Sequence, residues 1–434
     1  MDGLRWPFDG LAPGFEALLS VALIVVIAMF CWTTVLFVRG LRAASIPPPI
    51  PPAGADEFLW VFLVPALNEE VTIADSVKRL LSIPVRERVV MVMEDGSDDR
   101  TGEILDAIDD PVLSVVHRRS PEARKGKAAA LNQGYRMLEK LSGRFDRDKV
   151  IVCVVDADGR LDPSAPGYVA AHLADPRVGG VQTLVRIYNR NRLLTWFQDL
   201  EFSVYGWLFQ AGRNGWGTAG MGGNGQFNRL SALDAIADER GPWRDKLTED
   251  QDLGLRLIAA GWEGRQELRG TVEQQGLPKL RPLLRQRTRW SQGNLQAMSL
   301  IPRVLRAPFP LRVRVEQLAY LLMPVWQTTV GVALIAAIYL LATGTAPVWG
   351  GGPWWQLAFF YLLCFGGTVM GCIAARSDRG ARGWALGFLL GHVYALYTWF
   401  IWPVLVRSSL RQLVSRRQWA KTERESLDSA LGTS

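Results

Sequence analysis

The pattern of hydrophobic positions divides the chain into long apolar segments near both ends and a mixed part between them. Residues Ala17–Val38 form an uncharged apolar run of about 20 residues, the length that a helix needs to cross ~30 Å of hydrocarbon. Three more apolar segments follow at Gln317–Ala342, Trp354–Ala375 and Trp384–Val406. We therefore expect an integral membrane protein with one N-terminal and three C-terminal transmembrane segments.

Between these segments, from Phe58 to Gly270, short β-rich runs alternate with helical stretches. The expected strands are Leu59–Val64, Val89–Met93, Val112–Val116 and Val150–Val155, and the expected helices are Ala74–Leu81, Gly102–Ile108 and Lys127–Leu138. This alternation predicts an α/β domain with a mostly parallel sheet and helices on both faces. Ligands of such sheets bind at the carboxyl ends of the strands.

The same pattern predicts the domain organisation. We expect an N-terminal transmembrane helix in residues 1–45, a proline-rich linker in 46–57, an α/β domain in 58–295, interfacial amphipathic helices in 296–316, three transmembrane segments in 317–406 and a basic tail in 407–434. Arg39 and Arg42 follow the first apolar segment, so the positive-inside rule places the α/β domain in the cytoplasm, at a plasma (inner) membrane. Three C-terminal crossings would leave the basic tail outside, against the same rule. Either one segment does not span fully or the rule fails here.

The net charge of +7 is unevenly distributed. Nine Lys and Arg residues and no acid lie between Lys279 and Val315. This block leads into an apolar segment, which favours anionic lipid headgroups or an anionic substrate over nucleic acid, and no nucleic-acid-binding module is visible. The four cysteines and three histidines show no metal-ligand spacing, which argues against zinc chemistry, a disulfide framework and a histidine-based triad.

Three motifs carry side chains suited to chemistry. Asp156-Ala157-Asp158 follows a wholly apolar run, so two carboxylates emerge at the sheet edge, either to hold Mg²⁺ or Mn²⁺ against a diphosphate or as a capped turn. Thr248-Glu249-Asp250 precedes a helical stretch and offers either a general base or an acidic first helical turn. In Gln286-Arg287-Thr288-Arg289-Trp290 the spacings predict one helix face that carries Gln286, Arg289 and Trp290. That face would either bind phosphate and a sugar ring or belong to an interfacial basic-aromatic helix.

The order and spacing of these motifs resemble membrane-bound family-2 glycosyltransferases of the cellulose-synthase-like and hyaluronan-synthase-like kind. Their pattern is D-x-D, then T-E-D, then Q-x-x-R-W. Three further segments, Pro65–Glu69, Gly126–Asn132 and Gly222–Arg229, resemble that family's P-x-x-N-E, G-K-A-x-A-L-N and glycine-rich segments. The resemblance covers about residues 58 to 295.

The resemblance implies a GT-A fold and an inverting transfer of sugar from a nucleotide diphosphate sugar, with a UDP-sugar expected as the donor. It implies Asp250 as the catalytic base, and Asp156 and Asp158 as ligands of Mg²⁺ or Mn²⁺. The implied nucleotide-sugar-binding residues are Pro65, Ala66, Glu69, Glu94, Asp95, Lys127, Asp156, Gln286 and Arg289, and the implied acceptor-binding residues are Glu249 and Trp290. Leu67 stands where relatives often have an aromatic residue and Glu94 where they usually have Asp, which leaves open how the nucleotide base is held.

Several functions remain to be weighed. The leading hypothesis is a synthase that extends a polysaccharide and passes it through its own helices, because Trp290 suits a terminal sugar. A glycolipid synthase that adds one or two sugars to a lipid is favoured because four crossings make a narrow tunnel wall unless the protein forms a homo-oligomer. A non-catalytic transporter or sugar channel predicts ionisable residues inside the membrane segments, where His392 is the nearest candidate. A nucleotidyltransferase gives no reason for a Trp in the basic helix.

Overall fold

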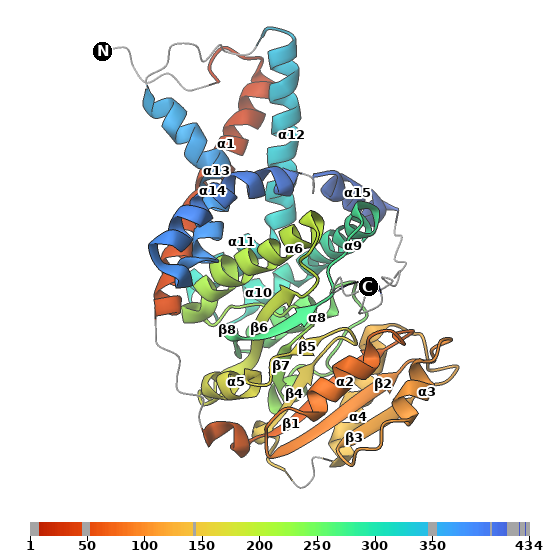
Figure 1. Cartoon of the computed structure of the whole chain (residues 1–434). Helices are drawn as coiled ribbons and strands as arrows, with labels where there is room; N and C mark the ends of the chain where they lie inside the picture. Colours follow the sequence, from red (N-terminus) through yellow and green to blue (C-terminus); the bar gives the residue numbers. More distant parts are fainter. Residues whose placement is uncertain are drawn as a thin grey trace.

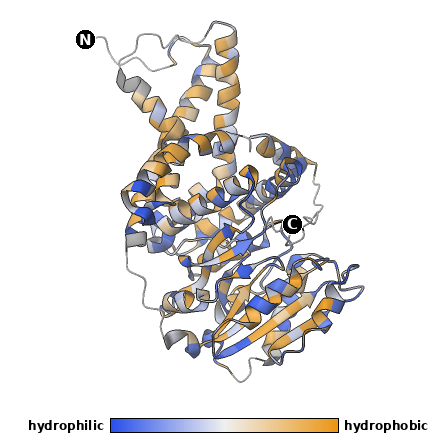
Figure 2. Cartoon of the chain, in the orientation of Figure 1, coloured by the Kyte–Doolittle hydropathy of each residue, from blue (hydrophilic) through white to orange (hydrophobic). Residues whose placement is uncertain are grey.

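The computed structural model describes residues 8–45, 53–141, 145–345, 354–399, 402–414, 425 and 430. An α/β domain forms one end of the molecule, and long helices project from the other end (Figure 1). Figure 2 shows that these projecting helices are largely hydrophobic along their length. The proline-rich residues 46–52 of the expected linker lie outside the described residues, and the rest of that linker forms the short helix η1 (Ala53–Glu57).

One eight-stranded sheet organises the α/β domain, in the order β3-β2-β1-β4-β7-β6-β8-β5. Its strands are β1 (Leu59–Ala66), β2 (Glu87–Glu94), β3 (Leu113–His117), β4 (Val150–Val154), β5 (Arg160–Leu161), β6 (Val178–Ile187), β7 (Gln226–Arg229) and β8 (Glu263–Gln274). The four strands expected from the sequence are β1 to β4, and they pair in parallel. The second half is mixed, because β7 runs antiparallel to both β4 and β6 while β6 and β8 are parallel.

Helices cover both faces of the sheet because its central strands are apolar at every position. In β1, Trp60, Phe62 and Val64 pack into one buried cluster with α2, whereas Val61 and Leu63 pack into another with α4. The helices of this domain are α2 (Ile73–Leu81), α3 (Thr101–Asp106), α4 (Lys127–Leu141), η3 (Arg147–Lys149), α5 (Ala165–Leu173), α6 (Leu193–Val204), η4 (Tyr205–Gln210), η5 (Ala211–Trp216), α7 (Leu230–Asp234), α8 (Glu249–Ala259) and α9 (Leu280–Ala297). Continuous apolar strands are typical of sheets buried on both faces.

The remaining helices belong to the membrane-facing end of the molecule. They are α1 (Pro13–Ser45), η6 (Met298–Leu300), α10 (Ile301–Arg306), α11 (Leu311–Leu321), α12 (Met323–Ala342), α13 (Trp354–Ala374), η7 (Ser377–Arg379), α14 (Gly380–Trp399) and α15 (Trp402–Leu413). Among the described residues, three stretches are long and apolar enough to cross a membrane: Pro13–Ala43, Met323–Ala342 and Ser377–Leu413. Ala358–Ala374 is a shorter apolar helix. Helix α1 packs against both α12 and α13.

One of the expected membrane segments is wrong in its extent. The expected segment Gln317–Ala342 is divided between α11 and α12, with Pro324 near the start of the second helix, where a missing N–H costs nothing. Gln317 itself is buried beside Glu316, so it is not part of the apolar helix. The expected segment Trp384–Val406 lies within the apolar stretch Ser377–Leu413.

The ends of α13 and of α14 both lie against the α/β domain. Cys372, near the end of α13, packs with Leu200 and Val204 of α6, and Tyr397, near the end of α14, donates a hydrogen bond to Glu201 of α6 at 3.0 Å. Helix α15 then packs along α9. Farther along the chain, Glu425 exchanges two hydrogen bonds with Gln275 of the α/β domain, at 2.8 and 2.9 Å. The described part of the C-terminal tail therefore lies beside the α/β domain.

Candidate active site

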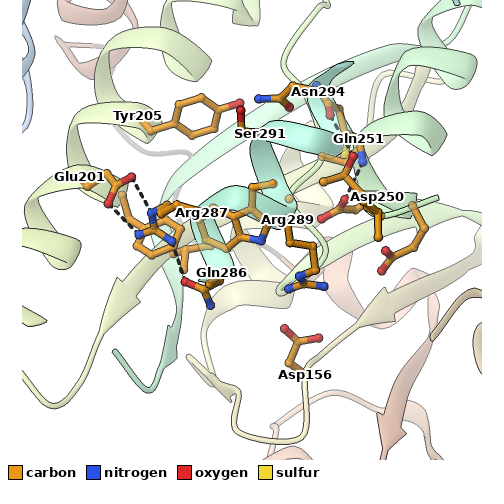
Figure 3. Close-up of a pocket in the computed structure, with 18 of the residues that line it drawn as sticks. Asp156, Glu201, Tyr205, Asp250, Gln251, Gln286, Arg287, Arg289, Ser291 and Asn294 are labelled. Carbon is orange, nitrogen blue, oxygen red and sulfur yellow. Dashed lines mark hydrogen bonds and ion pairs between the residues drawn. The ribbon is translucent and has the colours of Figure 1, made fainter. Parts of the chain in front are cut away.

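Residues from all the motifs line one cavity of about 850 Å³ between the sheet and the membrane-facing helices. Twelve of the thirteen site residues expected from the sequence line it: Pro65, Ala66, Glu69, Asp95, Lys127, Asp156, Asp158, Glu249, Asp250, Gln286, Arg289 and Trp290. Figure 3 shows the motifs facing one another across this space, with the guanidinium of Arg289 directed toward Asp156. The carboxyl ends of β1 and β4 place their loops at the same edge, as the sheet topology requires.

Glu94 is the one expected residue that does not line the cavity. Its side chain is 2% exposed and accepts hydrogen bonds from His117 at 3.1 Å and Arg119 at 2.8 Å. Burial alone would raise the pKa of Glu94, but hydrogen bonds from Ser97, Arg119 and His117 lower it instead. Because Glu94 ends β2 and pairs with His117 on β3, its carboxylate faces the neighbouring strand rather than the ligand space.

Lys127 connects two of the motifs. Its Nζ lies 2.6 Å from Asp156 Oδ1 and 3.5 Å from Glu249 Oε1. Burial by itself would lower the pKa of Lys127, but these two carboxylates raise it well above its usual range. The ammonium group is therefore fixed as a cation at the sheet edge, beside the carboxylates expected to meet a diphosphate.

Asp250 begins α8 and has a perturbed carboxylate. Burial, followed by the charge of Glu249, raises the pKa of Asp250 from 3.8 to about 7, while Lys127 acts in the opposite direction. A carboxylate with a pKa near neutrality is suited to general-base catalysis, since it is both available as the charged form and basic enough to accept a proton. Its Oδ1 accepts the backbone N–H of Gln251 at 2.8 Å, which fixes the orientation of the group.

The glycine-rich segment after η5 packs directly against Asp250. A Cβ atom added at Gly223 would lie 2.6 Å from Asp250 Oδ2, and the φ of Gly223 is +84°, in the region that favours glycine. Buried Gln182 holds the segment by accepting the N–H of Gly222 at 2.8 Å and donating to the carbonyl of Asn224 at 2.7 Å. Asn224 in turn accepts the N–H of Asp156 at 3.1 Å, so the segment joins Asp250 to the D-x-D motif.

The two D-x-D carboxylates fit a divalent cation. Asp156 and Asp158 follow β4 and both line the cavity, and hard oxygen ligands suit Mg²⁺ and Mn²⁺. Asp158 is 4% exposed, and its Oδ2 accepts the backbone N–H of Gln275 at 3.0 Å, which orients the carboxylate. Among the described residues, no cluster of three or more His, Cys, Asp and Glu side chains is arranged to hold a metal ion.

Helix α9 carries an ion pair that sequence reasoning missed. Arg287 is 5% exposed and donates to both carboxylate oxygens of Glu201, at 3.1 and 2.7 Å (Figure 3). Its guanidinium carbon also lies 4.1 Å from the centroid of the Trp290 ring, which meets Phe202 edge to face. The pair thus supports the indole that faces the cavity. The position of Arg287 inside Q-x-x-R-W was the available signal, but nothing in the sequence identified Glu201 as its partner.

The cavity continues from the sheet edge into the membrane-facing helices. On that side it is lined by residues of α1, α6, η4, η5, α11, α12, α14 and α15, which we call the membrane half. These residues include Trp32 on α1, Met323 on α12, and Trp399 and Trp402 on either side of the α14–α15 junction. The sequence analysis assigned none of these residues to the site.

Comparison with known proteins identifies the class. The family model described as "Glycosyltransferase like family 2" matches residues 60–293, more than half of the chain. The chain belongs to this family. A mannosyltransferase from Pyrobaculum calidifontis, solved in complex with GDP-Man and Mn²⁺, has the same fold, with a TM-score of 0.60, 19% sequence identity, and coverage of 92% of this chain and 100% of that one. The expected GT-A fold is thereby confirmed.

Two curated relatives extend the similarity beyond the α/β domain. The probable glycosyltransferase YdaM of Bacillus subtilis is 28% identical over 83% of this chain and 86% of its own length. A beta-monoglucosyldiacylglycerol synthase of Synechocystis is 29% identical over 71% of this chain and 68% of its own length. The chain is therefore a family-2 glycosyltransferase whose likeness to these enzymes includes much of the helical part.

Proposed function

We propose that the protein transfers a sugar from a UDP-sugar to the hydroxyl group of a membrane lipid. The observation that carries this proposal is the continuity of the cavity, which joins Asp156 and Asp250 to Trp32, Met323 and Trp399 on the membrane-facing helices. A lipid whose chains remain among those helices would present its head group to the base. The similarity to a glucosyldiacylglycerol synthase supports the same acceptor class.

In the proposed reaction Asp250 accepts the proton of the acceptor hydroxyl. The hydroxyl oxygen forms a bond to C1 of the donor sugar while the bond from C1 to the diphosphate oxygen breaks, and the nucleoside diphosphate leaves with the bonding electrons. One displacement of this kind inverts the configuration at C1. Lys127 and Arg289 stand on the side where negative charge develops on the leaving group, and Arg is suited to phosphate oxygens.

Asp156 and Asp158 are the proposed ligands of Mg²⁺ or Mn²⁺. When bound, such an ion supplies positive charge to the diphosphate. Glu69 and Asp95 line the cavity near the ends of β1 and β2, where the proposal places the nucleoside, together with Pro65 and Ala66. Gln286 is proposed to contact the diphosphate, and Glu249 and Trp290 to contact the acceptor.

The arrangement of the helices supports a specific membrane topology. We infer that α1, α12 and α13 cross the membrane, whereas α14 and α15 lie at its surface on the side of the α/β domain. The packing of Tyr394 and Tyr397 of α14 against α6 supports this, as do the hydrogen bonds of Glu425 with Gln275. The basic tail is then on the cytoplasmic side, where the positive-inside rule expects it, and the conflict in the sequence is removed because one segment does not span.

A polysaccharide synthase is the second candidate function. The observation that favours it is the indole of Trp290, which lines the cavity and is braced by Arg287 and Phe202 as a flat surface suited to a terminal sugar. A polymer would need a passage through the membrane. Three helices, α1, α12 and α13, are too few to enclose such a passage unless several copies of the protein assemble.

Product analysis tests the proposal. Purified full-length protein in lipid nanodiscs is incubated with Mn²⁺ or Mg²⁺ and radiolabelled UDP-glucose, UDP-galactose, UDP-N-acetylglucosamine or GDP-mannose. We expect the label to enter an organic-extractable lipid. Label in a water-insoluble polymer would instead identify the second candidate, and no transfer from any donor would refute both.

A further inference from the structure

The membrane half of the cavity contains two buried N–H donors without a hydrogen-bond partner among the described residues. They are Nε1 of Trp32, on α1, and Nε of Arg213, on η5, and both residues line the cavity. The guanidinium carbon of Arg213 lies 5.3 Å from the centroid of the Trp32 ring, so the two side chains are neighbours in the cavity wall. Buried donors are nearly always satisfied in folded proteins, and a pair in a cavity wall indicates a ligand with oxygen acceptors.

Arg213 is also part of a deeply buried ion pair. Its Nε lies 2.7 Å from Glu316 Oε1, and both side chains are 2% exposed, yet neither atom has a partner in hydrogen-bonding geometry. The charge of Arg213 is therefore balanced, while its Nε–H makes no hydrogen bond of good geometry. Taking two charges out of water is costly, and the cost is offset only when further hydrogen bonds are made. An oxygen-bearing ligand would supply them.

A short chain of contacts places this pair of donors close to the proposed base. The guanidinium carbon of Arg213 lies 4.4 Å from the centroid of the Tyr320 ring. The hydroxyl of Tyr320 accepts a hydrogen bond from Gln251 Nε2 at 3.0 Å, and Gln251 directly follows Asp250. A ligand held by Trp32 and Arg213 would therefore lie on the acceptor side of Asp250.

The charges of the membrane half restrict the ligand further. Among its described lining residues, the charged side chains are Glu201 and Arg213. Each has an opposite charge beside it, because Glu201 pairs with Arg287 and Arg213 pairs with Glu316. No cation is left over to balance a phosphate group, and an unpaired buried charge is strongly unfavourable. The membrane half thus favours an uncharged head group.

We propose that Trp32 and Arg213 form the acceptor head-group site, and that they donate hydrogen bonds to the oxygen atoms of an uncharged glycerol ester such as diacylglycerol. This inference rests on the proposed glycosyl transfer and names its acceptor class. Ester carbonyls and the glycerol oxygens are acceptors, which is what two N–H donors require. The acyl chains would lie along α1 and α12, whose apolar residues continue away from the site.

The test compares acceptors and single substitutions. The full-length protein in nanodiscs receives the donor that supports turnover, with dioleoylglycerol, dioleoylphosphatidylglycerol or a free gluco-oligosaccharide as acceptor. Trp32→Phe keeps an aromatic ring but removes Nε1, and Arg213→Lys keeps the charge but removes Nε–H. The control is Trp326→Phe, because Trp326 on α12 also has an unpartnered Nε1 but does not line the cavity.

We expect transfer to dioleoylglycerol at least tenfold more efficient than transfer to the anionic lipid or the oligosaccharide. Trp32→Phe and Arg213→Lys should each raise the KM for dioleoylglycerol roughly three- to tenfold, as for the loss of one hydrogen bond. Their Kd for UDP, measured by calorimetry, should stay unchanged, and Trp326→Phe should match the wild type in both values.

An unchanged acceptor KM in Trp32→Phe would overturn the assignment, and so would equal use of phosphatidylglycerol or a preference for the oligosaccharide. These results differ from failure of the proposed function, in which no acceptor receives sugar from any donor. Because Trp32→Phe leaves the buried ion pair intact, its outcome decides the matter even if Arg213→Lys does not fold.

Discussion

Asp250 occupies a place where a carboxylate is costly to keep charged. Burial and the charge of Glu249 raise its pKa from 3.8 to about 7, against the influence of Lys127. Because each pKa unit corresponds to ~1.36 kcal/mol, holding the charged form there costs up to about 4 kcal/mol of folding free energy. We therefore expect Asp250→Asn, which removes the charge at nearly constant shape, to abolish transfer and yet stabilise the protein at about pH 8.

The stability difference between Asp250→Asn and the wild type should depend on pH. The folded-state pKa of Asp250 lies above the unfolded value, so the stability contributed by its protonated form is fully present below about pH 4 and is lost as the pH rises through about 7. The Asn side chain does not titrate and loses nothing over that range. The advantage of Asp250→Asn should thus be small near pH 4 and complete above about pH 7.

Thermal unfolding followed by tryptophan fluorescence at about pH 5, 6, 7 and 8 measures the effect, which we expect to be a rise of several degrees in Tm at about pH 8. The control is Asp245→Asn, a change to an exposed carboxylate in the same loop, which should leave Tm unchanged. The reasoning is refuted if the variant is no more stable than the wild type at about pH 8, or if its advantage is as large at pH 5. Retained transfer would refute the assignment of Asp250 as the base.

Three further predictions test the same site. On the acid side, the wild-type kcat/KM should reach half its maximum at about pH 7. Glu249→Gln should move this midpoint to lower pH, because it removes a charge that raises the pKa of Asp250. An unchanged pH profile would contradict this. Gly223→Ala should lower transfer roughly tenfold or more, because the added Cβ would meet Asp250. The control Gly261→Ala, at a φ of +96° with nothing within 4 Å, should leave transfer unchanged. Equal losses in both variants would show that backbone strain is responsible. Chelation by EDTA should stop transfer and added Mn²⁺ should restore it, and activity that persists after chelation would argue against the metal.

Local sequence was sufficient for the first half of the α/β domain. Apolar runs gave β1 to β4, because strands buried on both faces must be hydrophobic throughout. Strands β6 and β8 were not predicted. Their sequences, Val178–Ile187 and Glu263–Gln274, contain glycine and many polar residues, and the latter is partly exposed. Strands of that composition are recognisable only through the neighbours with which they pair.

The motifs did not predict the direction in which each side chain points. Glu94 and Asp95 are adjacent in sequence, but only Asp95 lines the cavity, because Glu94 ends a strand and bonds to its neighbours on the β3 side. The partners of charged residues were equally hidden. Arg213 and Glu316 are about a hundred residues apart, and nothing local indicates that they meet.

The residues alone were enough for the family and for the three motifs, which meet at one edge of the sheet. These features depend on residue type and short-range spacing, which the chain states directly. Only the tertiary structure decided that α14 returns to the α/β domain, that Glu94 faces away from the ligand space, and that Trp32 and Arg213 leave donors unused beside the base. Those outcomes depend on contacts between distant segments, whose geometry is fixed when the sheet and the membrane-facing helices pack together.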